Sequence, residues 1–243
     1  MRRRFFVDEF TGTSAVIQGD TAHHLGHVLR AQTGQLYELS DGSSAWLARL
    51  ESVSRSRLEF ALVEQLAAPQ PTRDVILLLS IVKFDAYEWA IEKATELGVS
   101  RIIPLAAARS ERGLLAAARK RSERWQKILL EASQQSRRLR IPRLDELARP
   151  SQAFAGQTTG FRLLLSERSD APSIRKSLDG SHQATPSIGA ALAVGPEGGW
   201  TDDELSAARA AGFLEASLGQ LILRTETAVV AALATVNFAL SPE

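Results

Sequence analysis

A run of five apolar residues, Val75 to Leu79, constrains the fold of this chain more than any other feature. A strand that alternates apolar and polar residues can keep one face in water, whereas a strand that is apolar throughout must be covered on both faces. Such strands occur in parallel sheets with helices on each side. Similar runs recur at 163–165 and 190–194, with helical patterns between them. Residues 73–243 are therefore predicted to form an α/β domain with a parallel sheet.

The pattern in this region also predicts where the elements begin and end. Asp85 with Glu88 and Thr201 with Glu204 have the spacing of capping boxes, and Thr225 is expected to cap a last apolar helix. The predicted strands are 75–79, 101–105, 163–165, 190–194 and 218–223. The predicted helices are 85–98, 122–139, 201–212 and 225–240.

Residues 1–68 have a different pattern. Short apolar runs separated by turn residues predict strands at 5–7, 15–17, 35–39, 45–50 and 58–63. One short helix is expected at 21–30. So many short strands in so short a segment predict a small β-barrel. Residues 67–72 are predicted to be a linker, which sets the expected domains at 1–68 and 73–243.

Composition excludes several classes of protein. The chain of 243 residues contains no cysteine, so disulfides and thiolate metal sites are impossible. No stretch approaches the roughly 20 apolar residues that span a bilayer, and the basic start lacks the apolar segment of a signal peptide. His23 and His27 have a spacing that could bind metal, but no third ligand lies nearby in the sequence. A cytoplasmic protein without a metal or a membrane contact is expected.

The charge of the chain is unevenly distributed. Residues 109–143 hold eleven Lys and Arg against three Glu, a net charge of +8, although the whole chain has a formal net charge of only +1. A basic block of this kind suits contact with a phosphate backbone. A solvated, arginine-rich helix pair is the equally weighted alternative.

The sharpest local motif is the segment from Gly195 to Thr201, Gly-Pro-Glu-Gly-Gly-Trp-Thr. It follows a buried strand and opens a capped helix, which is where ligands favour open α/β sheets. It lacks the Gly-Lys-Ser/Thr of a phosphate-binding loop and is not Gly-x-Gly-x-x-Gly, so a phosphate cradle is not the first choice. A tight turn that binds nothing remains the alternative.

A second motif runs from Leu218 to Ala228. Gly219 stands just before an apolar strand pattern, where glycine is costly unless another group approaches the backbone closely. Arg224 and Glu226 stand at the predicted strand-to-helix junction, where side chains project into a cleft. An Arg–Glu pair with a capping role is the alternative.

Together these motifs resemble the bacterial 16S rRNA uracil-N3 methyltransferase family, a member of the SPOUT superfamily. Each motif alone is moderately specific, but their order and spacing extend along most of the chain. The matching segments are His24–Arg30, Lys83 with Lys93–Val99, Arg124–Ile128, Glu131–Arg138 followed by Pro142, Gly195–Gly199, Leu218–Gly219 and Ile222–Ala228.

The resemblance implies a fold and a cofactor. It implies a PUA-like β-barrel at 1–68 and a SPOUT domain at 73–243 whose C-terminal part forms a trefoil knot, a rare arrangement. It also implies S-adenosylmethionine bound in the knot by three loops. The implied cofactor residues are Leu165, Ser166, Val194, Gly195, Pro196, Glu197, Gly198, Gly199, Leu218, Gly219, Leu221, Ile222 and Leu223.

The family's reaction sets its own chemical demands. Uracil N3 carries a proton and becomes a good nucleophile only when a base removes it and a cation stabilises the charge on O2 and O4. Arg224 is expected to be that cation. Glu197 is expected to orient the substrate or act as the base, and Glu226 is the second candidate. A structural ion pair between Glu197 and Arg224 is the alternative.

The resemblance also implies partners. The family acts as a homodimer through the knot region, on 16S rRNA in the small ribosomal subunit. The barrel and the basic block are expected to bind RNA, with target choice from RNA shape and an extruded uridine. The expected RNA contacts are Arg2, Arg3, Arg4, His24, Arg30, Lys83, Arg109, Arg112, Arg121, Arg124, Arg137 and Arg138.

Three other functions stay open from the sequence. Another SPOUT enzyme could methylate ribose 2′-hydroxyls, a non-catalytic RNA-binding protein could keep an unused pocket, and a nucleotide-binding enzyme could use the glycine turn. Among the tryptophans, Trp89 and Trp125 fall on apolar helical faces and are predicted to be core residues. Trp200 is predicted to line the site or to pack in the core.

Overall fold

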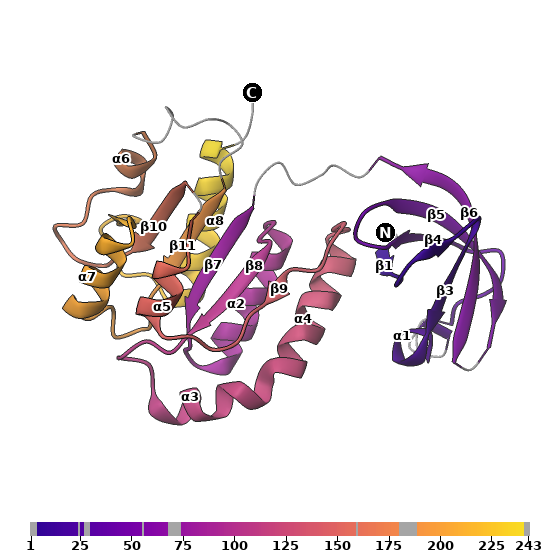
Figure 1. Ribbon diagram of the computed structural model, residues 1–243, viewed down its shortest axis with the longest axis horizontal. Coiled ribbons are helices and arrows are strands. Elements are labelled where there is room, and N and C mark those ends of the chain that lie inside the picture. The colour runs from indigo at the N-terminus through magenta and orange to yellow at the C-terminus, as the bar shows by residue number, and fades with distance from the viewer. Residues whose placement is uncertain are drawn as a thin grey trace. The chain divides into compact units, whose positions relative to one another are not determined.

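The computed structural model describes residues 4–23, 25–26, 30–54, 56–67, 74–158, 160–179 and 189–240. Its elements fall into two compact units (Figure 1). The first unit holds residues 1–70 with 130–141, and the second holds 71–129 with 142–243. Arg2, Arg3 and His24, which were expected to contact RNA, lie outside the described residues, as does His27.

The first unit is built on a six-stranded sheet with the strand order β1-β4-β5-β6-β3-β2. β1 and β4 are parallel, and the other neighbours are antiparallel. Apolar side chains of these strands, including Phe5, Ile17, Leu39 and Phe60, form a core of their own. The elements are β1 (Arg4–Phe6), β2 (Phe10–Thr11), β3 (Ser14–Gln18), α1 (Gly19–His23), β4 (Leu36–Ser40), β5 (Ala45–Val53) and β6 (Arg57–Leu66).

All five strands predicted for this region are present, and β2 was not predicted. The helix begins at Gly19, two residues before its predicted start. The short β2 strand pairs with β3 through Phe10 and Thr11. Two residues carry too little alternation to reveal a strand, which explains why the pattern did not indicate it.

Arg4 is buried in the first unit, with 6% of its surface exposed. Its guanidinium lies 3.1 Å from the Glu38 carboxylate and donates a hydrogen bond of 2.8 Å to the carbonyl of Arg137. Ser40 also donates to this segment, at 2.8 Å from the carbonyl of Leu139. The expected RNA contact at Arg4 is therefore wrong, because this side chain holds residues 137–139 against the N-terminal sheet.

The second unit contains a six-stranded parallel sheet in the order β12-β10-β11-β7-β8-β9. The fold class is thus the predicted one, an α/β domain with a parallel sheet. The strands are β7 (Val75–Ser80), β8 (Arg101–Leu105), β9 (Arg143–Leu144), β10 (Phe161–Leu165), β11 (Ala190–Val194) and β12 (Leu214–Ala216). The helices are α2 (Phe84–Glu96), α3 (Arg112–Ala118), α4 (Ser122–Gln135), α5 (Pro150–Ala155), α6 (Ile174–Asp179), α7 (Asp202–Ala210) and α8 (Thr225–Leu240), with a 3-10 turn at Arg119–Arg121. Residues 130–135 of α4 belong to the first unit.

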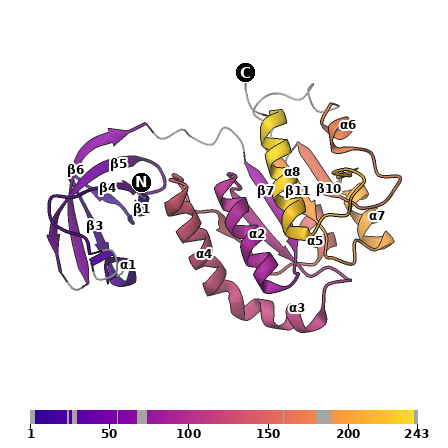
Figure 2. The ribbon, with the colours of Figure 1, turned by 180° about the vertical axis from the view of Figure 1, so that it is seen from behind.

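Both faces of this sheet are covered, as the apolar strands require. Alternate residues of β7 enter two separate cores: Leu77 and Leu79 pack with residues of α2 and α8, and Leu78 packs with Phe154 of α5 and Leu205 of α7. Figure 2 shows α2 and α8 side by side on one face, and Figure 1 shows α5 and α7 on the other. No helix in the described part of the chain is long and apolar enough to cross a membrane.

The last strand was predicted in the wrong place. Residues 218–223 form a loop, and the strand at the sheet edge is the preceding segment β12, which pairs with β10. Leu221 and Ile222 are 82% and 79% exposed, so the apolar triplet does not enter the core. Apolarity alone cannot separate a buried strand from an apolar loop that borders a binding site.

Two helix starts also differ from the prediction. α2 begins at Phe84 without a side-chain cap, because Glu88 turns to Arg121 and Arg124 instead of the helix start. Thr225 is the first residue of α8, and its hydroxyl donates to the carbonyl of Gly195 at 3.3 Å. α4 ends at Gln135 instead of Leu139.

The other predicted helix boundaries hold. The capping box of Thr201 with Glu204 at the start of α7 is confirmed. Gly98 and Gly212, which follow α2 and α7, both have positive φ. That conformation is the usual one just past a helix end.

The chain after β12 runs beside a neighbouring connection before it returns to the middle of the sheet. Ser217 donates to the carbonyl of Pro172 at 2.8 Å and accepts from Ile174 at 2.8 Å, so it runs beside the link from β10 to α6. The following helix, α8, then packs against α2 and β11, away from the edge strand. A return past another connection is the path that a trefoil knot needs, and few folds have it.

Candidate functional site

A cavity of about 1060 Å³ lies in the second unit, where β10, β11 and β12 end. Its walls come from the segments that follow these strands and from the first turns of α2 and α8. Ligands bind open parallel sheets at this edge, because the loops there diverge. The lining includes Lys83, Asp85, Ala86, Trp89, Arg109, Leu165–Arg168, Val194–Glu197, Gly199, Trp200, Leu205 and Ser217–Ala228.

The turn after β11 is held by Trp200. The indole Nε1 of Trp200 donates to the carbonyl of Leu165 at 2.8 Å and so joins the ends of β10 and β11. The ring lies close against Gly195: a Cβ on that glycine would lie 3.0 Å from ring atoms of Trp200. Glycine is therefore required at 195 by close approach.

Gly199 closes the same turn in a left-handed conformation, with φ +68°. Its amide donates to the carbonyl of Pro196 at 2.9 Å, and a Cβ there would lie 2.9 Å from the Glu167 carboxylate. Arg109 donates to the carbonyl of Gly198 at 2.8 Å. Trp200 and Arg109 thus hold the turn in place, and Glu167 lies against it.

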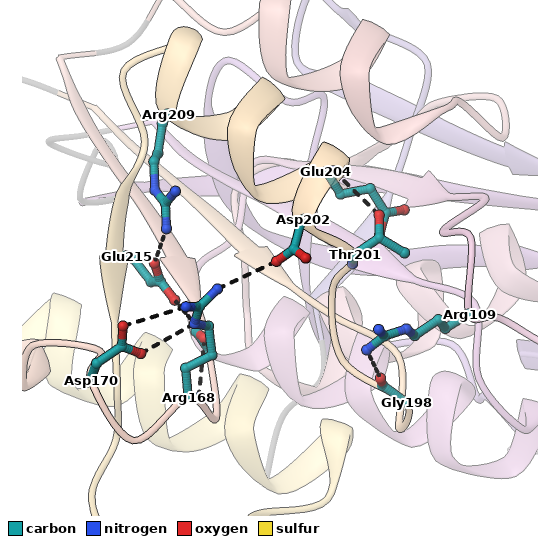
Figure 3. A network of polar contacts seen from close by, with 10 residues as sticks. Arg109, Arg168, Asp170, Gly198, Thr201, Asp202, Glu204, Arg209 and Glu215 are labelled. Carbon is teal, nitrogen blue, oxygen red and sulfur yellow. Dashed lines mark hydrogen bonds and ion pairs between the residues drawn. The ribbon is translucent and has the colours of Figure 1, made fainter.

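The loop that carries Arg109 is itself anchored. The backbone amide of Ala108 donates to Glu204 at 2.8 Å, and Ser110 donates to the carbonyl of Ile81 at 2.7 Å. Because Glu204 also forms the capping box of α7, one carboxylate fixes both the helix start and this loop. Figure 3 shows Arg109 reaching Gly198 beside that capping box.

A network of ion pairs holds the segment after β10. Arg168 pairs with Asp170 at 3.1 Å and with Asp202 at 3.5 Å, and Glu215 lies 4.0 Å away (Figure 3). Glu215 also pairs with Arg209 of α7 at 3.0 Å. The Arg168 guanidinium keeps the pKa of Asp170 below its usual value. These contacts connect one cavity wall to β12 and α7.

The three proposed catalytic residues lie around the same cavity. Glu197 is exposed at the turn after β11, and Arg224 and Glu226 flank the start of α8. Within the described part of the chain, Arg224 has no ion pair with either carboxylate. The structure therefore does not contain the Glu197–Arg224 pair that the sequence left open.

The cavity brings together most of the residues expected from the resemblance. Every expected cofactor residue lines it except Gly198, whose carbonyl binds Arg109 instead. Glu167, Arg168 and Asp85 also line it and were not expected. Glu167 and Arg168 directly follow a predicted buried strand, a signal that could have identified them.

Trp89 also lines the cavity, which corrects its prediction as a core residue. It is 43% exposed, whereas Trp125 is buried as predicted. Trp200 is both buried and at the cavity, so its two predicted roles coincide.

The expected RNA contacts are distributed over both units. In the second unit, Lys83 and Arg109 are at the cavity and Arg112 is exposed on α3. Arg124 and Arg121 both form ion pairs with Glu88, at 2.7 Å and 3.1 Å. The guanidinium of Arg121 also lies 4.4 Å from the centre of the Phe84 ring. In the first unit, Arg30 and Arg137 are exposed. Arg138 is partly exposed, and burial lowers its pKa to about 10.

The residues that the structure describes contain no cluster of three or more His, Cys, Asp or Glu that could hold a metal ion. The charged residues that line the cavity are four carboxylates, Asp85, Glu167, Glu197 and Glu226, and four cations, Lys83, Arg109, Arg168 and Arg224. Apolar surface from the loop at 218–223 lies beside them. This mixture suits an organic ligand that carries charges of both signs.

Comparison with known protein families decides the class of this site. The family described as RNA methyltransferase domain matches residues 68–237, and the family described as RNA methyltransferase PUA domain matches residues 17–63. The chain belongs to the RNA methyltransferase family. The α/β unit with its cavity is thus the methyltransferase domain, and the N-terminal sheet is PUA-like, as the resemblance implied.

Individual relatives are similar in sequence to this methyltransferase along most of its length. It is 36% identical over 224 residues to ribosomal RNA small subunit methyltransferase E of Synechocystis sp., covering 88% of this chain and 70% of the relative. It is 33% identical over 241 residues to the protein of that name from Mycobacterium bovis, covering 96% and 90%. A crystal structure of the Neisseria gonorrhoeae enzyme of that name, bound to S-adenosyl methionine, has a TM-score of 0.86 and 30% identity and covers 98% of each chain.

Proposed function

We propose that this RNA methyltransferase transfers a methyl group from S-adenosylmethionine to N3 of a uracil in the 16S rRNA of the small ribosomal subunit. The observation that carries the proposal is the single cavity formed by the turn at 195–199 and the loop at 218–224. The resemblance in sequence implies that these two segments form one cofactor site. The relatives named for methylation of small subunit rRNA support the same substrate.

The residues around the cavity fit the proposed cofactor. S-adenosylmethionine carries a methyl group on a positively charged sulfur, together with an adenine and an amino acid. Leu218, Leu221 and Leu223 offer apolar surface for the adenine, and the turn at 195–199 leaves its backbone accessible. The carboxylates of Glu167 and Glu197 are suited to the positive charges.

Arg224 and a nearby carboxylate would act on the uracil. Arg224 has no competing ion pair in the described part of the chain, so its guanidinium is available to stabilise the negative charge that develops on O2 and O4. Glu197 would accept the N3 proton or orient the base, and Glu226 is the second candidate for the proton acceptor. Both carboxylates line the cavity.

RNA would be held mainly through its phosphates, by each unit separately. Lys83, Arg109 and Arg112 would bind in the second unit, and Arg30 and Arg137 in the first. Arg121, Arg124 and Arg138 add positive charge, although the first two share the carboxylate of Glu88. Such contacts give affinity without choice of sequence. The enzyme would act in the cytoplasm, on rRNA within the small subunit.

A homodimer through the knot region completes the proposal. Leu221, Ile222 and Phe238 are 82%, 79% and 87% exposed, and all three belong to the loop and helix that end the chain's path through the second unit. Large apolar side chains that are left exposed suit an interface, and these lie before the start of α8 and near its end. The molar mass in solution, measured by light scattering, is expected to be that of two chains.

Methyl transfer to isolated ribosomal subunits tests the substrate. Small subunits from cells that lack the modification would be incubated with the protein and S-adenosylmethionine labelled in its methyl group, with large subunits as the control. Nucleoside analysis of the small subunit RNA is expected to find the label in 3-methyluridine. Label in a 2′-O-methyl nucleoside would instead support a ribose methyltransferase, and a protein that binds no cofactor would be a non-catalytic RNA-binding protein.

A further inference from the structure

Trp89 is the least expected residue in the cavity wall. It lies in the middle of α2, where Tyr87, Glu88, Ala90 and Ile91 are all buried, yet 43% of Trp89 is exposed. A single exposed apolar residue is ordinary on a protein surface. This one borders a cavity that also contains the candidate catalytic residues. Part of its indole is therefore available to a ligand in the cavity.

The part of α2 that reaches the cavity forms a wall distinct from the loops. Lys83, Asp85, Ala86 and Trp89 line it, and residues three or four apart share one face of a helix. The expected cofactor residues all come from the last residues of β10 and β11 and from the segments after β10, β11 and β12 instead. The α2 wall is thus left for a second ligand.

The size of the cavity leaves room for that second ligand. Pockets for one small molecule occupy roughly 300–1,000 Å³, and this cavity measures about 1060 Å³. Two cations at the cavity, Lys83 and Arg109, suit the phosphates that flank a nucleotide in RNA. An aromatic ring near such cations is the usual platform for an unstacked base.

We propose that Trp89 positions the target uracil by stacking against it. The inference rests on the proposed function and assigns to α2 the task of holding the base while Arg224 and the carboxylates act on it. A base that leaves its RNA stack loses its neighbours, and an aromatic face in the active site replaces them. Trp89 is a substrate-binding residue in this account and takes no part in cofactor binding.

Two variants of Trp89 separate stacking from bulk. Trp89→Phe keeps an aromatic face, and Trp89→Leu keeps an apolar side chain without one. The steady-state constants kcat and KM for unmodified small subunits, the Kd for S-adenosylmethionine by calorimetry, and the molar mass in solution would be measured for both. Trp89→Leu is expected to lower kcat/KM about 10- to 100-fold, mainly through KM, as loss of a stacked base predicts. Trp89→Phe is expected to stay within about threefold of the wild type, with cofactor Kd and molar mass unchanged in both.

Several results would overturn the stacking role. Equal kcat/KM in Trp89→Leu and wild type would remove it, and equal losses in both variants would mean that the indole acts by shape alone. A parallel loss of cofactor affinity would place Trp89 against the cofactor, and a halved molar mass would place it in a dimer interface. Because wild-type protein serves as the internal standard, absence of 3-methyluridine in its product would instead overturn the proposed function, and this inference with it.

Discussion

Trp200 and Leu165 are joined by a hydrogen bond of 2.8 Å from the indole Nε1 to the backbone carbonyl. The bond connects the end of β10 with the turn that follows β11, and both residues line the cavity. The ring of Trp200 in turn fills the space where a Cβ of residue 195 would lie. The shape of the proposed cofactor site thus depends on one buried indole.

Trp200→Phe is expected to lower the free energy of unfolding by about 1–3 kcal/mol, because the Leu165 carbonyl loses its donor inside the protein. Affinity for S-adenosylmethionine should fall with it. Chemical denaturation and calorimetry would measure the two effects. Trp125→Phe is the matched control, since Trp125 is equally buried but its Nε1 has no partner in the described part of the chain. A larger loss for Trp125→Phe than for Trp200→Phe would contradict the role of the hydrogen bond.

Gly195→Ala tests the close contact between residue 195 and the ring of Trp200. The added methyl would lie 3.0 Å from the indole of Trp200, which is held by Leu165 and cannot move freely. Overpacking of this kind costs about 1–3 kcal/mol, so we expect cofactor affinity to fall about tenfold, equivalent to about 1.4 kcal/mol. Gly113→Ala in α3, where the nearest atom is 3.7 Å away, should keep wild-type affinity. Unchanged cofactor binding in Gly195→Ala would show that the turn adapts.

Arg224→Ala is expected to reduce kcat by about 100- to 1,000-fold, the usual loss when one group that stabilises transition-state charge is removed. The Kd for S-adenosylmethionine should change only a few-fold, because the guanidinium is assigned to the uracil. Arg224→Lys retains the charge without the planar fork and should recover part of the activity. Rapid-quench methyl transfer and calorimetry separate these effects. Equal losses of rate and cofactor affinity would contradict the assignment.

Glu88→Gln is expected to remove a pH-dependent part of the stability. The hydrogen bond from Arg124, with the nearby charges of Arg124 and Arg121, lowers the pKa of Glu88 below its usual 4.5. A lowered folded-state pKa means that the stabilisation is present above about pH 4.5 and is lost as the pH falls through the lower folded value. Because Arg124 is exposed, the effect at pH 7 should be only about 1 kcal/mol.

Urea denaturation of wild type and Glu88→Gln at pH 7 and at successively lower pH would measure this difference. The difference in free energy of unfolding between the two proteins should shrink as the pH falls below 4.5. Glu92→Gln is the control on the same helix, because within the described residues the carboxylate of Glu92 pairs with Lys93 alone and is 44% exposed. A difference that stays constant with pH would mean that the charge of the Glu88 carboxylate contributes nothing to stability.

The parallel sheet was predictable because its central strands are apolar throughout. The runs at 75–79 and 190–194 can be covered only by helices on both faces, and both lie at the centre of the observed sheet. The edge strand β12 gave no comparable signal, since Leu214–Ala216 is short and contains a glutamate. The more apolar segment at 221–223 carried the strand signal instead, although it lies in the cavity wall.

The candidate site was predictable where it depends on backbone and sequence order, and less so where it depends on tertiary packing. The glycine turn and the segment from Leu218 to Glu226 lie together as the family resemblance implied. The prediction that Trp89 is a core residue is wrong, because helical periodicity shows which face of a helix is apolar but not whether a neighbouring element covers each residue on it. Glu88 was misassigned because a tertiary ion pair with Arg124 replaced its local capping role.

A crystal structure of the protein with S-adenosylhomocysteine, the demethylated form of the cofactor, tests the central claim most directly. The account predicts density for the ligand between the turn at 195–199 and the loop at 218–223, with Arg224 near the sulfur side and Trp89 left uncovered. Ligand bound elsewhere, or the same cavity filled by protein side chains at saturating ligand, would contradict it.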